Sequence, residues 1–583
     1  MRPLALLLLA SAALAADPVR QAPRPVRPAE RGVGRQAPDT ALTGLDGKTR
    51  RLSDLKERKA VVIALTSTSC PISLKYAPTL ARLEKAYRDK HVAFVFVNPV
   101  ETDAVDPAKV PFTGLYVHDK TGAFAKAVGA TTTTDVIVLD PTRTVVYHGA
   151  VDDQYGQGYS RDEPREAYLT RALDALLAGQ PIAVPATEAP GCALDLKDVR
   201  APGTALTYHG QVQRLVQTHC VECHRKGGVA PFALDTMKDV VAHAGQIKKV
   251  VEAGTMPPWF AAPPERGPSP WINDRSLPAV AKADLLAWLA GDRAAGNPAD
   301  APRPRTFNDE WQIGTPDLVV QLPKPVKVQA EGTMDYQNVT AETDLTEDRW
   351  VRALEVRPTA KAVVHHVLVF VIPPADRKLP LYPVARSEAQ GYYAIYVPGN
   401  STLVYPDGFG KLLPKGSKVR FQIHYTPNGT ATEDRTALGV VFAKEKPRHE
   451  VLVTGLVNTK FRIPAGADDH KVEAVIPIVP FNAKILGFLP HMHVRGKAFR
   501  YEMTAPGGKP EVLLDVPRYD FNWQLMYTFA EPKPVPRGTK LSATAWYDNS
   551  EKNPANPDPT KEVRWGKQTS DEMMLGYLEF YIP

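Results

Sequence analysis

Proline restricts the fold of this chain more than any other residue type does. Of the 583 residues, 55 are proline, about 9%, against a usual share of ~5%. Proline has no backbone N–H and interrupts helices and central strands, so it belongs in loops and at strand ends. We therefore expect short elements joined by many loops and disfavour a mainly helical protein. The length predicts about four domains.

The first residues, MRPLALLLLASAALAAD, are typical of a secretory signal: one arginine, an apolar run and an Ala-Leu-Ala cleavage site at 13–15. We predict a signal peptide at 1–16 and a proline- and arginine-rich linker at 17–40. No later segment has about 18 unbroken apolar residues, so no membrane span is expected. The protein is predicted to be periplasmic or secreted. Its net charge of +7 is spread along the chain, which argues against a nucleic-acid partner.

Residues 41–190 alternate strands and helices. Strand-like runs occupy 60–66, 91–98, 135–140 and 144–149, and an amphipathic helix is expected at 166–179. Cys70 follows the first run and precedes a helical pattern that includes Tyr76 and Tyr87. This arrangement resembles the thioredoxin and peroxiredoxin fold, an α/β domain.

The redox chemistry of that domain stays open between two interpretations. Ser73 stands where thioredoxins have their second cysteine, Thr134 where they have a cis-proline, and Ile63 where peroxiredoxins have a proline. In the first interpretation Cys70 is a redox thiol at a helix N-terminus, where the dipole lowers its pKa, and Cys192 resolves it. In the second, the domain has lost its chemistry and serves packing or docking. Cys70 and Cys192 are predicted as free thiols or one disulfide.

Residues 191–300 contain the sequence CVECH, in which Cys220, Cys223 and His224 form a covalent attachment motif for c-type haem. The region resembles a small, all-α, class I cytochrome c domain, with His224 as the proximal ligand. Met256, on a loop stiffened by prolines, is the preferred distal ligand. Met237 and His243 are the competing candidates.

From residue 305 onward, short alternating runs separated by turn residues predict an all-β region built of sandwiches. Metal-ligand side chains recur there in two groups: His365, His366 and His424, then His491, His493 and Met573. Imidazole suits copper in proteins, and a soft thioether selects Cu(I). His491 and His493 share one face of a strand because alternate residues point the same way. Neighbouring His365 and His366 reach one metal only where the backbone is irregular.

The order His-His, Gln-x-His-Tyr, His-x-His and Asp-Glu-Met resembles the type II copper, ascorbate-dependent monooxygenases, the family of the peptidylglycine and dopamine monooxygenases. The resemblance covers 305–583 and implies two all-β jelly-roll sandwich domains, 305–445 and 446–583, separated by a solvent-filled cleft. It implies an electron-transfer copper on the first group of ligands. It implies a second copper, where dioxygen and substrate meet, on the other group. Gln422 and Tyr577 also match the family.

Leu489 and Leu575 stand where the peptide-amidating members have substrate-binding Arg and Asn, so peptidyl-glycine is not the expected substrate. We predict an exported, copper-dependent monooxygenase with two copper ions and one haem c. It would hydroxylate a C–H bond of an unidentified substrate with dioxygen, using electrons from a periplasmic donor. The alternatives are a haem and copper electron-transfer or copper-binding protein without oxygenation, and a redoxin-type thiol peroxidase.

Overall fold

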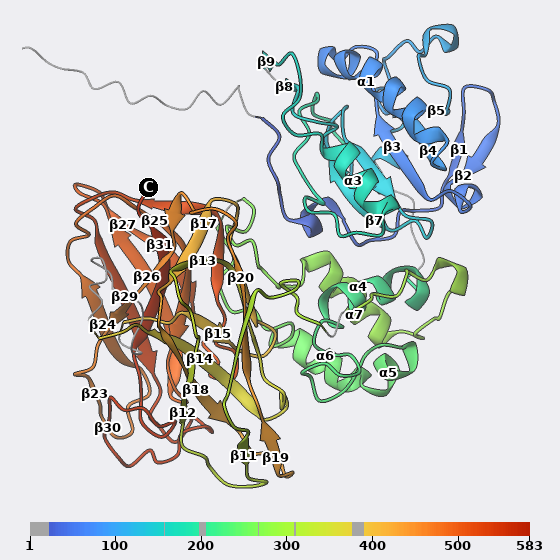
Figure 1. The fold of residues 1–583 in the computed structure, drawn as a ribbon. Helices are drawn as coiled ribbons and strands as arrows, with labels where there is room; N and C mark the ends of the chain where they lie inside the picture. The colour runs from blue at the N-terminus through green and yellow to red at the C-terminus, as the bar shows by residue number, and fades with distance from the viewer. Residues whose placement is uncertain (1–21, 157, 197–205, 266, 308–309, 376–389) are drawn as a thin grey trace, which may run out of the picture. The chain divides into compact units, whose positions relative to one another are not determined.

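The computed structural model describes residues 22–156, 158–196, 206–265, 267–307, 310–375 and 390–583 (Figure 1). The predicted signal peptide lies outside these residues. The chain divides into two compact units, one of Met1–Leu215 with Pro278–Arg303 and one of Val216–Leu277 with Pro304–Pro583. The residues of the predicted cytochrome domain, 191–300, are thus distributed over both units.

The first unit contains a five-stranded sheet in the order β5-β4-β3-β6-β7. Its central strands pair in parallel, whereas β6 and β7 add antiparallel pairs. The strands are β3 (Ala60–Leu65), β4 (Val92–Asn98), β5 (Leu115–His118), β6 (Val136–Leu139) and β7 (Val145–Gly149). Four of them match the predicted runs, and β5 is an additional strand. Strands β3 and β6 are buried at every position, as expected for a sheet that is covered on both faces.

Three helices accompany this sheet: α1 (Pro71–Arg88), α2 (Ala123–Ala127) and α3 (Tyr168–Leu177). Helix α1 begins directly after Cys70, with Pro71 at its first position, where a missing N–H costs nothing. Its buried positions include Tyr76, Leu80 and Tyr87, which join one apolar core cluster with β3, β4 and α3. This is the predicted thioredoxin-like arrangement, and it places Cys70 between the first buried strand and its helix.

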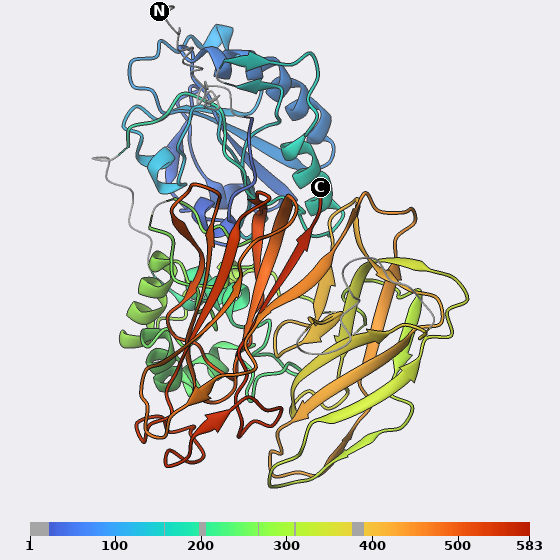
Figure 2. The ribbon, with the colours of Figure 1, turned by 90° about the vertical axis from the view of Figure 1, so that its left-hand side faces the viewer.

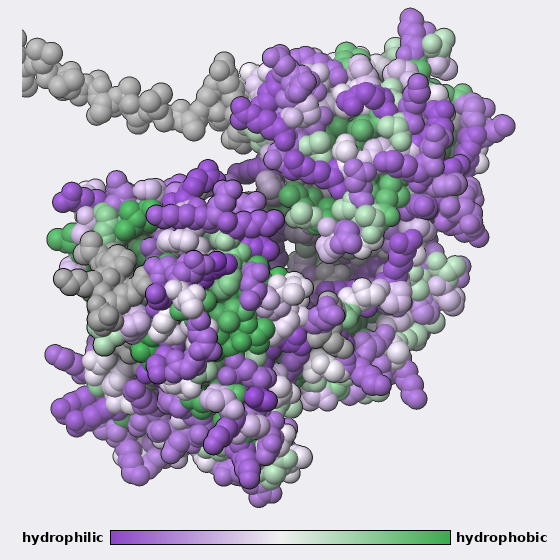
Figure 3. Space-filling model, in the orientation of Figure 1, coloured by the Kyte–Doolittle hydropathy of each residue, from purple (hydrophilic) through white to green (hydrophobic). Residues whose placement is uncertain are grey.

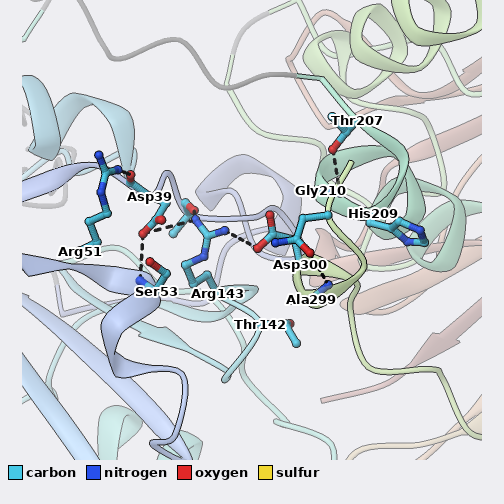
Figure 4. A network of polar contacts seen from close by, with 12 residues as sticks. Asp39, Arg51, Ser53, Thr142, Arg143, Thr207, His209, Gly210, Ala299 and Asp300 are labelled. Atoms are coloured by element: carbon cyan, nitrogen blue, oxygen red, sulfur yellow. Dashed lines mark hydrogen bonds and ion pairs between the residues drawn. The ribbon is translucent and has the colours of Figure 1, made fainter. Parts of the chain in front are cut away.

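Residues 278–303, which include α7 (Ala279–Ala290), belong to the same unit. Arg143 connects this segment to the sheet. Its guanidinium lies 2.6 Å from a carboxylate oxygen of Asp300 and 3.8 Å from one of Asp39 (Figure 4). A further ion pair, 2.9 Å long, joins Arg35 to Asp284. The helical segment is therefore held to the thioredoxin-like domain by charged contacts that are far apart in sequence.

The second unit begins its β region with two sheets that share one apolar core cluster, as in a sandwich. One sheet is formed by β10 (Leu318–Gln321), β20 (Ala437–Phe442), β13 (Arg349–Arg357), β16 (Thr402–Val404), β17 (Phe409–Leu413) and β21 (His449–Glu450). The other is formed by β12 (Gln337–Glu342), β18 (Lys418–Tyr425), β14 (Val364–Ile372) and β15 (Ala394–Tyr396). Strand β21 lies beyond the predicted end of this domain at residue 445, because it pairs with β17.

A second sandwich follows, with two four-stranded sheets around another core cluster. One sheet has the order β22 (Leu452–Val457), β31 (Leu575–Tyr581), β25 (Ala483–His491) and β28 (Tyr527–Val535). The other has the order β24 (His470–Ile476), β29 (Lys540–Tyr547), β26 (Gly496–Thr504) and β27 (Pro510–Val516). Figure 2 shows the two sandwiches, drawn in yellow to orange and in red, side by side within this unit. The predicted, largely β C-terminal region is confirmed.

Residues 216–277 pack against the second sandwich. Phe260 and Trp271 are buried in its core cluster, and the Trp271 and Phe529 rings stack with centroids 4.5 Å apart. Arg518 donates hydrogen bonds to the carbonyl oxygens of Ala253 and Gly254. This segment, which carries α5 (Met237–Ala242) and α6 (Ala244–Glu252), is therefore part of the β unit.

Hydrophilic side chains cover most of the face shown in Figure 3. Among the described residues, no helix combines the length and the apolar character needed to cross a membrane.

Candidate metal centre

His365, His366 and His424 converge from two neighbouring strands. Strands β14 and β18 pair antiparallel, and His366 stands opposite His424. The register shifts between Val364 and His366, so His365 is the extra residue of a β-bulge. This bulge confirms the predicted irregular backbone and turns both neighbouring imidazoles to one side. One ligand nitrogen from each of the three histidines lies within 4.8 Å of the others.

Burial keeps these imidazoles neutral. Burial, reinforced by the neighbouring His491, lowers the pKa of His365 to about 4. Burial and the other histidines lower the pKa of His424 to about 3, and they hold the pKa of His366 well below its usual range. A neutral imidazole is the form that coordinates a metal ion, because the nitrogen lone pair must be available.

Several ring nitrogens in this cluster are buried without a hydrogen-bond partner among the described residues. They are Nε2 of His365, Nε2 of His366, Nδ1 of His424 and Nε2 of His493. Each unsatisfied buried polar group costs about 1–3 kcal/mol, so four in one place are unfavourable unless they serve a ligand. In the first group, one ring nitrogen of each of three histidines lies within 4.8 Å of the others, and imidazole donors fit copper or zinc. The residues present therefore fit the metal that the sequence predicts.

His491 and His493 end strand β25 and start the following turn. Nδ1 of His491 lies 2.7 Å from Oε1 of Gln524, and Nδ1 of His493 lies 3.2 Å from the carbonyl oxygen of Asp571. With the proton on Nδ1, each ring donates to its neighbour and keeps Nε2 as the metal-binding atom. Burial also holds the pKa of His493 well below its usual range. Two imidazoles with fixed tautomers are thus presented together, with ring centroids 5.5 Å apart.

Glu572 organises the backbone around this second group. Its carboxylate accepts hydrogen bonds from the backbone N–H groups of His493 (2.8 Å), Arg495 (2.7 Å) and Met573 (3.2 Å). Burial raises the pKa of Glu572 to about 8, although these donors and the Arg495 charge act to lower it. The buried Glu572 carboxylate therefore links the backbone of the His-x-His turn to the backbone of Met573.

Met573 and Met574 point into different cores. Met573 is buried in the apolar core cluster of the first sandwich, whereas Met574 and Met492 are buried in the core of the second sandwich. Met573 therefore faces the core of the first sandwich, whereas Met492 faces that of the second. Its carbonyl oxygen accepts a 2.7 Å hydrogen bond from the Tyr547 hydroxyl. Met573 remains the predicted thioether ligand of the second group.

The two histidine groups lie against each other, which differs from the expected solvent-filled cleft. The ring centroids of His366 and His491 are 5.9 Å apart. Tyr336, from the first sandwich, contacts His366, His424 and His493 with centroids 5.5, 4.7 and 6.5 Å away. Phe521, from the second sandwich, stacks on His365 at 4.6 Å. Aromatic rings thus fill the space between the groups, and Met573 and Leu489 join the core of the first sandwich.

The other residues matched to the family take several positions. Gln422 is buried in β18, two residues before His424 and opposite Leu368 of β14. Tyr577 is buried in β31 and packs on Tyr392 with ring centroids 5.4 Å apart. Leu489 stands opposite Tyr577 and Leu575 opposite His491 in the ladder between β25 and β31. Both leucines are fully buried core residues.

The predicted haem-attachment motif forms a tight turn after α4 (Gln213–His219). The backbone N–H of His224 donates to the carbonyl oxygen of Cys220 at 2.9 Å. His224 Nδ1 lies 3.1 Å from the Phe232 carbonyl oxygen, which leaves Nε2 as the atom for an axial bond. The Phe232 ring stacks on His243 with centroids 4.0 Å apart and lies 4.7 Å from the His224 ring. Met256 precedes a cis proline at 257 and is half-buried.

Cys70 and Cys192, 122 positions apart in the sequence, come together in the first unit. Burial acts to raise the pKa of the Cys70 thiol, but the nearby Cys192 thiol and Thr133 hydroxyl lower it. Both cysteines are free thiols in the structure. The two cysteines are therefore close enough for the first interpretation of the sequence, in which Cys192 resolves Cys70.

Sequence reasoning missed five side chains of the metal centre: Tyr336, Phe521, Gln524, Thr569 and Glu572. Thr569 places its hydroxyl 3.3 Å from Nε2 of His424, although it belongs to the second sandwich. Only Glu572 carried a local signal, since it lies in the Asp-Glu-Met motif itself. Tyr336, Phe521 and Thr569 contact histidines of the other sandwich, so those contacts depend on how the two sandwiches pack. Gln524 lies in a loop and contacts His491 of its own sandwich.

Comparisons with known proteins agree with this geometry over part of the chain. Residues 32–163 match the redoxin family, and residues 448–583 match the family described as copper type II ascorbate-dependent monooxygenase, C-terminal domain. No curated protein matches the chain. The second match implies copper and supports an oxidoreductase.

Solved structures that resemble part of the chain include three bacterial proteins. A hypothetical protein from Sinorhizobium meliloti 1021 is 25% identical, over 30% of this chain and 96% of its own, with a TM-score of 0.26. An uncharacterized conserved protein from Geobacillus kaustophilus is 29% identical, over 30% and 95%, with a TM-score of 0.25. Peroxidoxin BcpB from Mycobacterium tuberculosis is 20% identical, over 25% and 97%, with a TM-score of 0.20. The chain carries a redoxin domain at residues 32–163 and a copper type II ascorbate-dependent monooxygenase C-terminal domain at residues 448–583.

Proposed function

We propose that this protein is an exported copper monooxygenase that hydroxylates a C–H bond with dioxygen and draws electrons from a covalently attached haem c. The observation that carries the proposal is the convergence of five imidazoles, four of them buried, from two β-sandwiches in two groups. Export is supported by the N-terminal sequence and by the haem-attachment motif in the same chain.

The six predicted ligand side chains divide into two metal positions. His365, His366 and His424 would hold one copper, and His491, His493 and Met573 the other. Bound copper would supply one-electron redox chemistry and dioxygen activation, with the thioether favouring Cu(I). Gln524 and the Asp571 carbonyl oxygen hold the protons on Nδ1 of His491 and His493 and so fix the orientation of both rings. Tyr336 and Phe521 cover the centre and exclude bulk water from it.

The position of Cys223 supports haem as the electron source. Its Sγ lies 3.4 Å from where a Cβ on Gly399 would stand, and the Arg275 guanidinium donates a hydrogen bond to the Gly399 carbonyl oxygen. Gly399 belongs to the turn that follows β15, whose Tyr396 pairs with Val367 of β14. Val367 directly follows His366. The turn beside Cys223 is thus connected to the first metal position by the pairing of β15 with β14. A haem attached to Cys223 would lie next to this turn.

Met256 remains the proposed distal haem ligand, with His243 as the competing side chain because it lies near His224 across the Phe232 ring. The visible absorption spectrum of the oxidised haem separates ligation by a thioether sulfur from ligation by an imidazole nitrogen. Replacement of Met256 by Ala should convert the spectrum to that of a protein lacking a thioether ligand. Replacement of His243 by Ala should leave the spectrum unchanged.

An oxygen pulse after anaerobic reduction tests the proposal. The copper- and haem-loaded protein should reoxidise its haem when oxygen is added, and added ¹⁸O₂ should place one labelled atom in a hydroxylated product when candidate small hydrophobic substrates are screened. Met573→Leu keeps a similar volume and should abolish labelled product while the haem spectrum is unchanged.

An alternative function, electron relay or copper storage without oxygenation, predicts a different outcome. The reduced protein would then stay inert to oxygen, with neither haem reoxidation nor hydrogen peroxide release. That result, with both coppers present, would contradict the oxygenase proposal.

A further inference from the structure

The redoxin domain contains a cavity of about 550 Å³ at the β5 edge of its sheet. The cavity lies where edge strand β5 ends short of its neighbour β4. Strand β4 pairs with β3 from Val92 onward but with β5 only from Val95 onward. Residues 92–94 therefore line the cavity instead of meeting a further strand. A cavity of this size falls within the range of small-molecule sites, about 300–1,000 Å³.

A hairpin and a short 3-10 helix also line the cavity. The hairpin consists of β1 (Ala41–Thr43) and β2 (Thr49–Arg51), and the helix spans Leu52–Leu55. A bridge between Gly44 and Val117 attaches the hairpin to β5. Four apolar side chains of the wall remain only half-buried: Leu45, Leu55, Phe112 and Leu115. An apolar ligand would remove these side chains from their remaining contact with water, which is favourable.

Positive charge predominates among the ionisable side chains of the cavity. Four arginines line it against two acids: Arg50, Arg51, Arg58 and Arg88 with Asp46 and Glu84. The Arg50 guanidinium lies 2.6 Å from the Asp46 carboxylate and offsets its charge. Arg51, Arg58 and Arg88 are exposed to solvent. Because a guanidinium presents its N–H groups in a fork that matches a carboxylate, these arginines favour an anionic group at the cavity.

The second acid, Glu84, is occupied by Thr113 and positions one of the arginines. The Glu84 carboxylate is buried and accepts hydrogen bonds from the Thr113 backbone N–H at 3.1 Å and from the Thr113 hydroxyl. The same hydroxyl accepts a 2.7 Å hydrogen bond from the Arg88 guanidinium. Gly114 lets this segment approach β4, because a Cβ there would stand 2.5 Å from the Phe94 carbonyl oxygen. Glu84 thus holds Arg88 at the cavity through Thr113.

We propose that this cavity binds a small carboxylate with an apolar body, such as a medium-chain fatty acid. The carboxylate would accept hydrogen bonds from Arg58 and Arg88, and the apolar body would contact the leucine side chains and Phe112. The site is distinct from the predicted redox thiol, because it lies at the start of β4, whereas Cys70 follows the end of the parallel strand β3. It includes no residue of either histidine group, so it is independent of the proposed oxygenase.

Calorimetric titration of the full-length protein with octanoate tests the proposal. Octanoate combines a carboxylate with a hydrocarbon chain, whereas acetate lacks the chain and octanamide lacks the charge. Octanoate should bind saturably at one site per chain, and acetate and octanamide should each bind at least about tenfold more weakly. Absence of saturable octanoate binding, or an affinity for acetate or octanamide equal to that for octanoate, would overturn the proposal.

Variants and cross-linking locate the bound octanoate. Arg58→Gln combined with Arg88→Gln should weaken octanoate binding about tenfold, as expected for the loss of two exposed ion pairs, without lowering the melting temperature. Arg82→Gln changes another exposed arginine of α1 that does not line the cavity, and should leave the affinity unchanged. Octanoate that carries a diazirine should label peptides from the cavity lining, within 42–58, 92–95 and 112–116. Labelling only elsewhere, or full affinity in the double variant, would contradict the proposed site.

Discussion

At the scale of single residues, the metal centre depends on atoms that are not themselves predicted ligands. The Gln524 amide oxygen and the Asp571 carbonyl oxygen set which nitrogen of His491 and His493 faces the metal. A ring that rotates or changes tautomer loses its coordination geometry, so such neighbours typically contribute 10–100-fold to metal affinity.

Gln524 gives the sharpest residue-scale prediction. Gln524→Leu removes the acceptor for His491 Nδ1 and should weaken copper binding at the second position about 10–100-fold, while copper at His365, His366 and His424 is retained. Competitive chelator titration of the Cu(I) protein measures both affinities. Gln524→Glu keeps an acceptor at the same place and is the matched control. Equal losses of copper affinity in Gln524→Leu and Gln524→Glu would show that the hydrogen-bond acceptor does not determine copper binding at this position.

At the scale of strands, one buried ion pair joins the two sandwiches. Lys411 of β17 lies 2.8 Å from the carboxylate of Glu579 of β31, and both side chains are almost fully buried. Lys411 also donates to the Tyr393 carbonyl oxygen at 3.0 Å, and the Tyr405 hydroxyl lies 3.2 Å from Glu579. Burial lowers the pKa of Lys411, although Glu579 acts to raise it. This pair helps hold the histidine groups together.

Removing one member of the pair should be costly. Lys411→Met leaves the Glu579 carboxylate buried and unpaired, and should reduce the unfolding free energy of the β region by about 3–5 kcal/mol. Urea denaturation followed by tryptophan fluorescence measures the change. Lys418→Met breaks the exposed pair with Glu342 and should cost only about 0–1 kcal/mol.

The double variant Lys411→Met with Glu579→Leu separates charge from packing. Without an unpaired charge, its stability should return most of the way to that of the unchanged protein. A double variant as unstable as Lys411→Met alone would mean that the ion pair itself, rather than the isolated carboxylate, determines stability.

The sequence predicts strands and ligands where the signal is local. The Val- and Ile-rich runs locate β3, β4, β6 and β7, and adjacent His365 and His366 require the bulge that β14 has. The contacts of Tyr336 with His493 and of Phe521 with His365 could not be predicted, because they depend on packing between segments about 157 and 156 positions apart. The burial of Trp271 in the second sandwich is equally non-local. The alternation of apolar and polar residues predicts which face of a strand is buried, but not which strand faces pack against each other.

At the scale of the whole molecule, one chain carries two neighbouring cysteines, a predicted haem-attachment motif and two groups of histidines. The thiol pair lies in the first unit, whereas Cys223 and both histidine groups lie in the second. Within the second unit, Cys223 lies next to the turn that follows β15, and β15 pairs with the strand of His365 and His366. The chain itself thus offers a short connection from the haem motif to the first metal position.

Copper content, measured together with haem, tests the central claim most directly. The protein should bind two coppers for each haem, His424→Ala should retain one, and His470→Ala, at a histidine outside both groups, should retain both. Elemental analysis with a haem assay supplies these ratios, and electron paramagnetic resonance of the oxidised protein shows which centre remains. Two coppers in unchanged protein and one in His424→Ala are the predicted result. Zinc in place of copper, or no loss of copper in His424→Ala, would contradict the account.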